Sequence, residues 1–125
     1  MFDHISIGTK DTKKSGAFYD ATLAPLGHKR LSDDKTSLGY GDKAVQLWIL
    51  AAGKPVAANP DSGLHLCFTA MSRAAVDAFH AAALAHGGSD NGKPGLRKDY
   101  GPDYYAAFVI DPDGYRLEAY CSKKA

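Results

Sequence analysis

Cysteine is scarce in this sequence, and its two positions exclude a CxxC metal or redox motif. Cys67 and Cys121 are the only cysteines, and neither has a second cysteine at that spacing. In a cytosolic protein such residues are usually reduced, buried and small hydrophobic side chains. The alternative for either residue is a thiol that faces a pocket.

Long apolar runs and an excess of one charge are also missing. No apolar segment approaches the roughly 20 residues that a membrane span requires. The 15 Lys and Arg residues are scattered and nearly balance 14 Asp and Glu, which leaves a formal net charge of +1. We therefore expect neither a nucleic-acid nor a membrane partner. The first residues pass directly into an alternating segment without the pattern of a signal peptide, so we expect a cytoplasmic protein.

The chain has the size and composition of one globular domain. It has 125 residues, of which 45% are hydrophobic and 23% charged. This length is sufficient for a single sizeable core.

Three segments alternate between an apolar face and a mixed face with the period of a β-strand. They cover residues 3–8, 64–69 and 115–121, and their mixed faces carry His4, His65 and Glu118. This pattern is typical of a sheet that is covered by helices on one side and open to a pocket on the other.

The remaining elements repeat one order in both halves of the chain. Helices are predicted over 12–23, after an Asp11/Thr12 cap, and over 72–84 from a Ser72 cap. Further strands are expected at about 28–33, 36–41, 44–50 and 104–110, with a turn at 111–114 and a Gly- and Pro-rich loop at 92–102. This order predicts that the single domain consists of module one at about 1–53, a linker at 54–61 and module two at 62–125.

The ionisable residues on the mixed faces are candidate metal ligands. His4 and His65 occupy corresponding positions in the two halves, and Glu118 stands on the closing strand of the second. Two imidazoles and one carboxylate can hold a divalent ion with open positions for water or substrate. Gln46 would face the same cavity as a neutral fourth ligand. Taken singly, a histidine on a strand is more often a hydrogen-bonded residue than a metal ligand, and this alternative applies to both His4 and His65.

Motifs at both ends of the chain strengthen this interpretation. The chain opens with Phe-Asp-His-Ile-Ser-Ile-Gly at 2–8, followed by Asp11 and the segment 15–20, and it carries Asp-Pro-Asp-Gly-Tyr-Arg-Leu-Glu at 111–118. These segments resemble the start and the DPDGxxxE ending of the vicinal oxygen chelate superfamily of glyoxalases, bleomycin resistance proteins and dioxygenases. Residues 63–105 resemble a subgroup of bacterial glyoxalase-like proteins.

The resemblance implies a fold, a cofactor and an assembly. The expected fold is α+β, with two βαβββ modules whose curved mixed sheet surrounds a central cavity. One divalent ion (Zn, Ni, Mn or Fe) is expected, with His4, Gln46, His65 and Glu118 as its ligands. Relatives commonly form homodimers, some with modules paired across chains, so we expect a homodimer.

The resemblance also implies an activity, with alternatives. It favours a metal-dependent lyase, isomerase or thiol transferase that acts on a small oxygenated metabolite. Bacterial glyoxalase I has Glu where this chain has Gln46, which is neutral and cannot serve as a general base, so Glu118 is the catalytic candidate. The alternatives are a metal-free module that sequesters a drug-like ligand and a ring-cleaving dioxygenase, although dioxygenases are usually longer.

Several aromatic residues and one cation are candidate substrate-binding residues. Trp48 shares a face with Gln46, and Tyr120 shares one with Glu118. Arg97 and Tyr100 lie on the predicted loop, and Tyr104 begins the next strand. Together they suit a small carbonyl or carboxylate compound. In the alternative interpretation, Trp48 and Tyr104 fill the concavity of the sheet and Arg97 is solvated.

Overall fold

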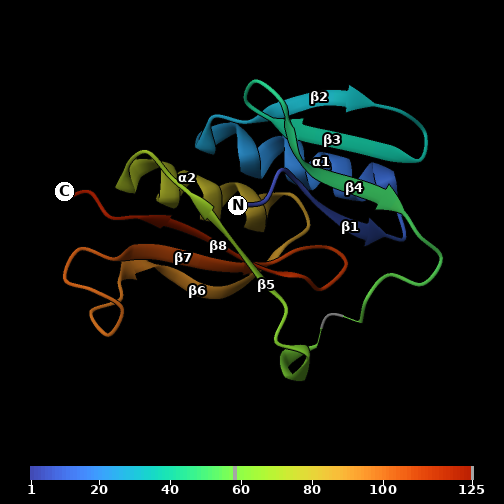
Figure 1. The fold of residues 1–125 in the computed structure, drawn as a ribbon. Coiled ribbons are helices and arrows are strands. Elements are labelled where there is room, and N and C mark those ends of the chain that lie inside the picture. Colours follow the sequence, from blue (N-terminus) through green and yellow to red (C-terminus); the bar gives the residue numbers. More distant parts are fainter. Residues whose placement is uncertain (58, 125) are drawn as a thin grey trace.

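The computed structural model describes residues 1–57 and 59–124, and within them the predicted repeat of βαβββ modules is confirmed (Figure 1). The strands form two four-stranded mixed sheets, in the orders β1-β4-β3-β2 and β5-β8-β7-β6. Within each sheet the first strand pairs in parallel with the last strand of its module, and the other pairs are antiparallel. The fold is therefore α+β, as expected.

Module one begins with β1 and ends with β4. Its elements are β1 (Ile5–Thr9), α1 (Thr12–Leu23), a 3-10 turn (Ala24–Leu26), β2 (Lys29–Asp33), β3 (Ser37–Gly41) and β4 (Val45–Ala51). The predicted cap of the first helix is Asp11, whose side chain accepts hydrogen bonds from the backbone N–H groups of Lys13 and Lys14.

Module two repeats the order after a short 3-10 turn (Pro60–Ser62). Its elements are β5 (His65–Thr69), α2 (Arg73–Ala85), β6 (Ser89–Leu96), β7 (Tyr105–Ile110) and β8 (Arg116–Cys121). Ser72 caps α2 by accepting a hydrogen bond from the Ala75 N–H, as predicted. Neither helix is long and apolar enough to cross a membrane, as judged over 1–57 and 59–124.

The prediction of one long loop at 92–102 was wrong in its first half. Residues 89–96 form the edge strand β6, which pairs with β7 through two register shifts around Gly92 and Gly95. Gly92 has φ +151°. Irregular edge strands tolerate glycine and proline, so their composition resembles that of a loop.

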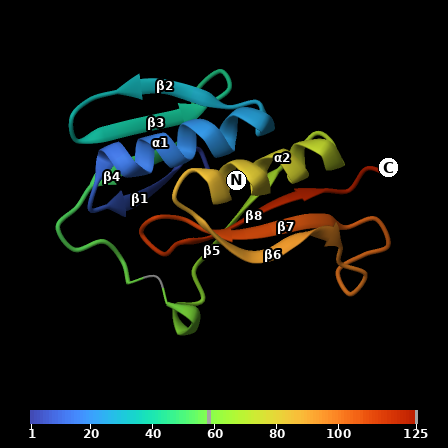
Figure 2. The same cartoon turned by 180° about the vertical axis from the view of Figure 1, so that it is seen from behind.

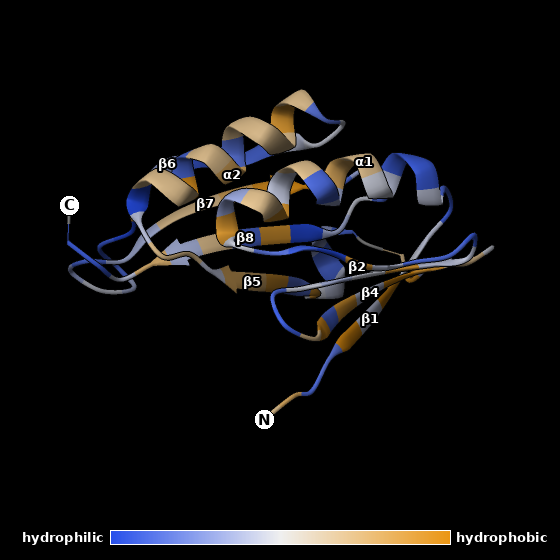
Figure 3. Ribbon diagram, turned by 90° about the horizontal axis from the view of Figure 1, so that it is seen from above, coloured by the Kyte–Doolittle hydropathy of each residue, from blue (hydrophilic) through white to orange (hydrophobic). Residues whose placement is uncertain are grey.

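The two helices lie next to each other and bring the modules together (Figure 2). Phe18 and Leu23 of α1 and Val76 and Phe79 of α2 are buried in one core that both modules share. Figure 3 shows the helices on one side of the molecule, with β1 and β4 toward the other side. The opposite faces of the sheets are therefore left for a site.

A polar cluster at the turn between β7 and β8 joins the modules a second time. The Tyr19 hydroxyl donates to Asp111 Oδ2 at 2.5 Å, and the Thr9 hydroxyl donates to Asp113 Oδ2 at 2.5 Å. Asp111 Oδ1 accepts from the backbone N–H groups of Asp113 and Tyr115. The turn predicted at 111–114 is thus confirmed, and it links module two to β1 and α1 of module one.

Candidate functional site

The centre of the candidate site is a histidine–carboxylate pair on the open face of the second sheet. His65 begins β5, and Glu118 lies on the neighbouring strand β8. The distance between His65 Nε2 and Glu118 Oε1 is 3.0 Å. Glu118 is only 3% exposed, whereas His65 is half-exposed. Burial of a carboxylate destabilises the fold unless other groups pair with it, so Glu118 depends on the groups that contact its two oxygens.

The second oxygen of Glu118 is held by a tyrosine. The Tyr104 hydroxyl donates to Glu118 Oε2 at 2.6 Å. Burial and the hydrogen bond to Glu118 raise the pKa of Tyr104, so the phenol stays protonated and remains a donor. The two carboxylate oxygens therefore have different partners, Oε1 facing an imidazole and Oε2 a phenol.

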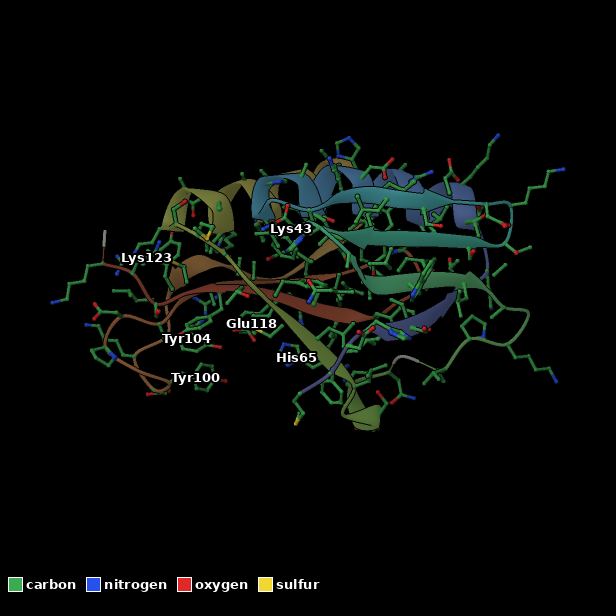
Figure 4. The ribbon with its side chains drawn as sticks, turned by 45° about the horizontal axis from the view of Figure 1, so that its top comes forward. Lys43, His65, Tyr100, Tyr104, Glu118 and Lys123 are labelled. Atoms are coloured by element: carbon green, nitrogen blue, oxygen red, sulfur yellow. The ribbon has the colours of Figure 1, made fainter. Side chains whose placement is uncertain are left out.

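Three tyrosines form an aromatic series beside the pair. The rings of Tyr104 and Tyr120 stack with centroids 4.0 Å apart, and Tyr100 packs edge-on against Tyr104 at 5.3 Å. Figure 4 shows Tyr100, Tyr104, Glu118 and His65 following one another along the same side of the sheet. The structure thus brings three predicted substrate-binding tyrosines to the predicted catalytic carboxylate.

The Cys67 thiol lies on the same face, and the residue is exposed, so the expectation of burial is confirmed for Cys121 and wrong for Cys67. Cys67 is paired in register with Glu118. Burial, followed by the negative charge of Glu118, raises the pKa of Cys67 to about 12. The thiol is therefore protonated at neutral pH and unsuited to act as a nucleophile.

Arg97 does not reach the carboxylate pair. Its guanidinium donates to the backbone carbonyls of Gly95 and Lys93 at 3.0 and 2.6 Å and lies over the Phe108 ring, 5.3 Å from its centroid. Phe108 also stacks against His65 at 6.0 Å. Sequence reasoning missed Phe108, although alternation along β7 puts it on the same face as Tyr104.

The candidate residues of module one are His4, Gln46 and Trp48, and they lie outside the pair of His65 and Glu118. His4 Nδ1 lies 2.7 Å from Asp3 Oδ1, and the His4 side chain is about half-exposed. Trp48 lies on the face of β4 that also carries Gln46. Gln46 helps to line a cavity of about 430 Å³ between the modules, to which His65 and Cys67 contribute from β5.

The four predicted ligands do not come together at one place within a single chain. Among residues 1–57 and 59–124, no group of three His, Cys, Asp or Glu side chains is close enough together to hold a metal ion. His65 and Glu118 meet, whereas His4 pairs with Asp3 on the other module.

Comparison with known proteins gives one consistent result. The sequence-family model of the Glyoxalase/Bleomycin resistance protein/Dioxygenase superfamily matches residues 1–119. No curated protein sequence matches the chain. A crystal structure of a glyoxalase/bleomycin resistance protein from Albidiferax ferrireducens T118 is 35% identical, with a TM-score of 0.82 and coverage of 97% of this chain and 98% of that one.

Two other solved structures are similar at lower identity. A putative glyoxalase from Bacillus halodurans is 25% identical, with a TM-score of 0.75 and coverage of 97% and 95%. A V278E glyoxalase I mutant from Zea mays is 18% identical, with a TM-score of 0.67, and the match covers 95% of this chain and 45% of that one. The likeness to the maize enzyme concerns the fold alone.

Proposed function

Because this chain belongs to the Glyoxalase/Bleomycin resistance protein/Dioxygenase superfamily, we propose that it is a divalent-metal-dependent, glyoxalase-like enzyme for a small oxygenated metabolite. The observation that carries this proposal is the pair of His65 and Glu118 on the open face of the second sheet. Fold alone would not support it, since one architecture hosts many reactions.

The geometry of the pair is compatible with two neighbouring metal ligands. A divalent ion would be held by the two side chains together if their donor atoms lay near each other, since imidazole nitrogen and carboxylate oxygen are both common ligands. His65 Nε2 and Glu118 Oε1 lie 3.0 Å apart, so both atoms could contact one ion. Tyr104 acts as an outer hydrogen-bond partner for the carboxylate, and such partners commonly orient metal ligands.

The third ligand has to come from elsewhere, because one chain does not bring His4 to the pair. His4 immediately precedes β1, His65 begins β5, and both strands are edge strands of their sheets. Exposed edges are sites of association between chains. Phe2 and Ile5 beside His4 line the cavity to which His65 contributes, and they are still 71% and 36% exposed, which leaves apolar surface for a second copy to bury. In the proposed enzyme, a second copy supplies His4, and the protein is a homodimer.

The proposed roles follow from the chemistry of the residues. A divalent ion held by His4, His65 and Glu118 would supply Lewis-acid polarisation of a substrate carbonyl oxygen. Glu118 would accept the proton that the substrate carbon loses, and the electron pair left on that carbon would be delocalised onto the neighbouring carbonyl oxygen. Tyr104 holds the plane of the Glu118 carboxylate. Tyr100 and Tyr120 contribute aromatic surface for the substrate beside this group.

Metal content tests the proposal. Protein purified without chelator is compared by elemental analysis with a His65→Ala/Glu118→Ala variant. A His86→Ala/Asp99→Ala variant is the matched control, because it removes one imidazole and one carboxylate from two exposed positions. We expect near-stoichiometric metal in the wild type and the control and its loss in the site variant. A folded wild type that neither contains nor takes up divalent metal would contradict the proposal.

A second candidate function is supported by the cavity between the modules. Its volume of about 430 Å³ lies in the range of small-molecule pockets, and its lining includes the apolar residues Leu23, Leu47 and Phe68. A metal-free module that sequesters an apolar, drug-like ligand would use this cavity. Saturable binding of such a ligand by protein that binds no metal would favour this function over the first.

A further inference from the structure

The two modules use the same register between their first and last strands. In module one, Ile5 is paired with Leu47 and Ser6 with Trp48. In module two, Leu66 is paired with Leu117 and Cys67 with Glu118. Both pairings are parallel, so the modules can be compared position by position.

Burial sets the alignment of the first strands. Ile7 packs into the shared core from β1, and Phe68 packs against that core from β5. Because side chains alternate along a strand, His4 and His65 correspond, each three positions before the matching core residue.

This correspondence places Trp48, rather than Gln46, opposite Glu118 in the repeat. Two residues after His65 stands Cys67, the register partner of Glu118, and two residues after His4 stands Ser6, the register partner of Trp48. By the same rule Gln46 corresponds to Arg116, the register partner of His65.

The side chain of Arg116 supports this assignment. Its guanidinium donates to the carbonyl of Pro60 at 3.3 Å, in the segment before β5. The Arg116 side chain therefore leads away from the pair of His65 and Glu118, and Gln46, its counterpart, lies on the cavity between the modules. Gln46 is shorter than Arg116 and is an exposed residue of β4.

A glycine on the neighbouring strand leaves space for the Trp48 indole on the open face of the first sheet. Trp48 is paired with Gly39 on β3, and a Cβ atom on Gly39 would lie 2.9 Å from indole Cζ3. In module two the large ring is on the other strand of the pair, because the partner of Glu118 on β7 is Phe108. Each module thus carries one large ring on the pair of strands that would flank the ion.

We propose that Trp48 occupies the fourth-ligand position and forms an apolar wall of the substrate pocket, so that His4, His65 and Glu118 are the only protein ligands. This inference rests on the proposed function. Two neutral imidazoles and one carboxylate leave the site with a net charge of +1 when a divalent ion is bound. The substrate class that fits is a small compound with oxygen donors at one end and an apolar carbon group that contacts the indole.

Two single substitutions distinguish the two positions. Trp48→Glu places a carboxylate at the proposed ligand position, and Gln46→Glu is the matched control two residues away on the same face. Zn²⁺ affinity is measured for both by competition with a chromophoric chelator. We expect Trp48→Glu to tighten Zn²⁺ binding at least tenfold and Gln46→Glu to change it less than about threefold, since only the first adds an anionic ligand. Tightening by Gln46→Glu alone would overturn the inference while leaving the proposed function intact.

The wild-type chain offers a second measurement that needs no substitution at Trp48. Trp48 is the only tryptophan, so indole fluorescence reports on this position alone. Added Ni²⁺ should quench the fluorescence with the affinity found by competition, and Gln46→Ala should leave both unchanged. Absence of quenching by bound Ni²⁺, or loss of Ni²⁺ affinity in Gln46→Ala, would overturn the inference. A wild type that binds neither metal would overturn the proposed function as well.

Discussion

Tyr19→Phe should destabilise the protein strongly, because it removes a buried hydrogen bond that joins the modules. Tyr19 is fully buried, and its hydroxyl is the partner of Oδ2 of Asp111, which is 3% exposed. A hydrogen bond to a charged group contributes about 1.5–3 kcal/mol, and the substitution leaves a buried carboxylate oxygen unpaired. We therefore expect the free energy of unfolding to fall by about 1.5–3 kcal/mol, with a decrease in Tm of roughly 5–15 °C for a domain of this size.

Burial is the physical basis of this prediction, and an exposed bond of the same kind provides its control. The Tyr105 hydroxyl donates to Asp77 Oδ1 at 2.7 Å on the surface of module two. Water replaces this partner when it is lost, so Tyr105→Phe should cost less than about 1 kcal/mol. Urea denaturation of both variants gives the comparison. A cost for Tyr19→Phe no greater than that for Tyr105→Phe would refute the reasoning.

Three further predictions concern the pKa of Asp111, the reactivity of the Cys67 thiol and the Asp11 cap of α1. Burial raises the pKa of Asp111 above its ordinary value of 3.8, so its contribution to stability is full below that pH and falls as the pH rises through the folded-state pKa. The stability of the wild type relative to Asp111→Asn, from urea denaturation, should accordingly fall between pH 3 and pH 7; a constant difference would contradict this. In protein freed of metal by a chelator, Cys67 should react slowly with iodoacetamide at pH 8 although the residue is exposed, as followed by mass spectrometry, and faster in Glu118→Gln, because burial of the thiol and then the Glu118 charge raise its pKa. Equal rates would refute that cause. Asp11→Ala should lower the free energy of unfolding by about 1 kcal/mol in urea denaturation, because Asp11 caps two N–H groups of α1, and an unchanged midpoint would count against the cap.

Local signals predicted most of the fold. The caps at Asp11 and Ser72 and the alternation of the strands depend on neighbours in the sequence, and the elements they predicted are present. β6 was missed because its glycines and Pro94 belong to an irregular edge strand, whose pairing with β7 decides its structure. Such pairing is a long-range contact that local composition does not report.

The candidate site was predictable in one half and not in the other. His65 and Glu118 were placed on mixed faces by alternation, and the parallel pairing of β5 with β8 brings them together. The position of His4 relative to this pair depends on how the two modules dock, and the docking contacts, between α1 and α2 and at Asp111, join residues far apart in the sequence. Strand periodicity contains no information on that docking. It also identifies a face without its register, so it does not distinguish Gln46 from Trp48, which share one face of β4.

Mixing two defective variants tests the central claim, a metal site shared between two copies. His4→Ala chains and Glu118→Ala chains are each expected to lack metal. After unfolding and joint refolding in equal amounts, half of the dimers pair one chain of each kind. Each of these mixed dimers has one intact site, so about one quarter of the wild-type metal content should return. Recovery of about one quarter would support the shared site, and a mixture as metal-free as its two parents would contradict it.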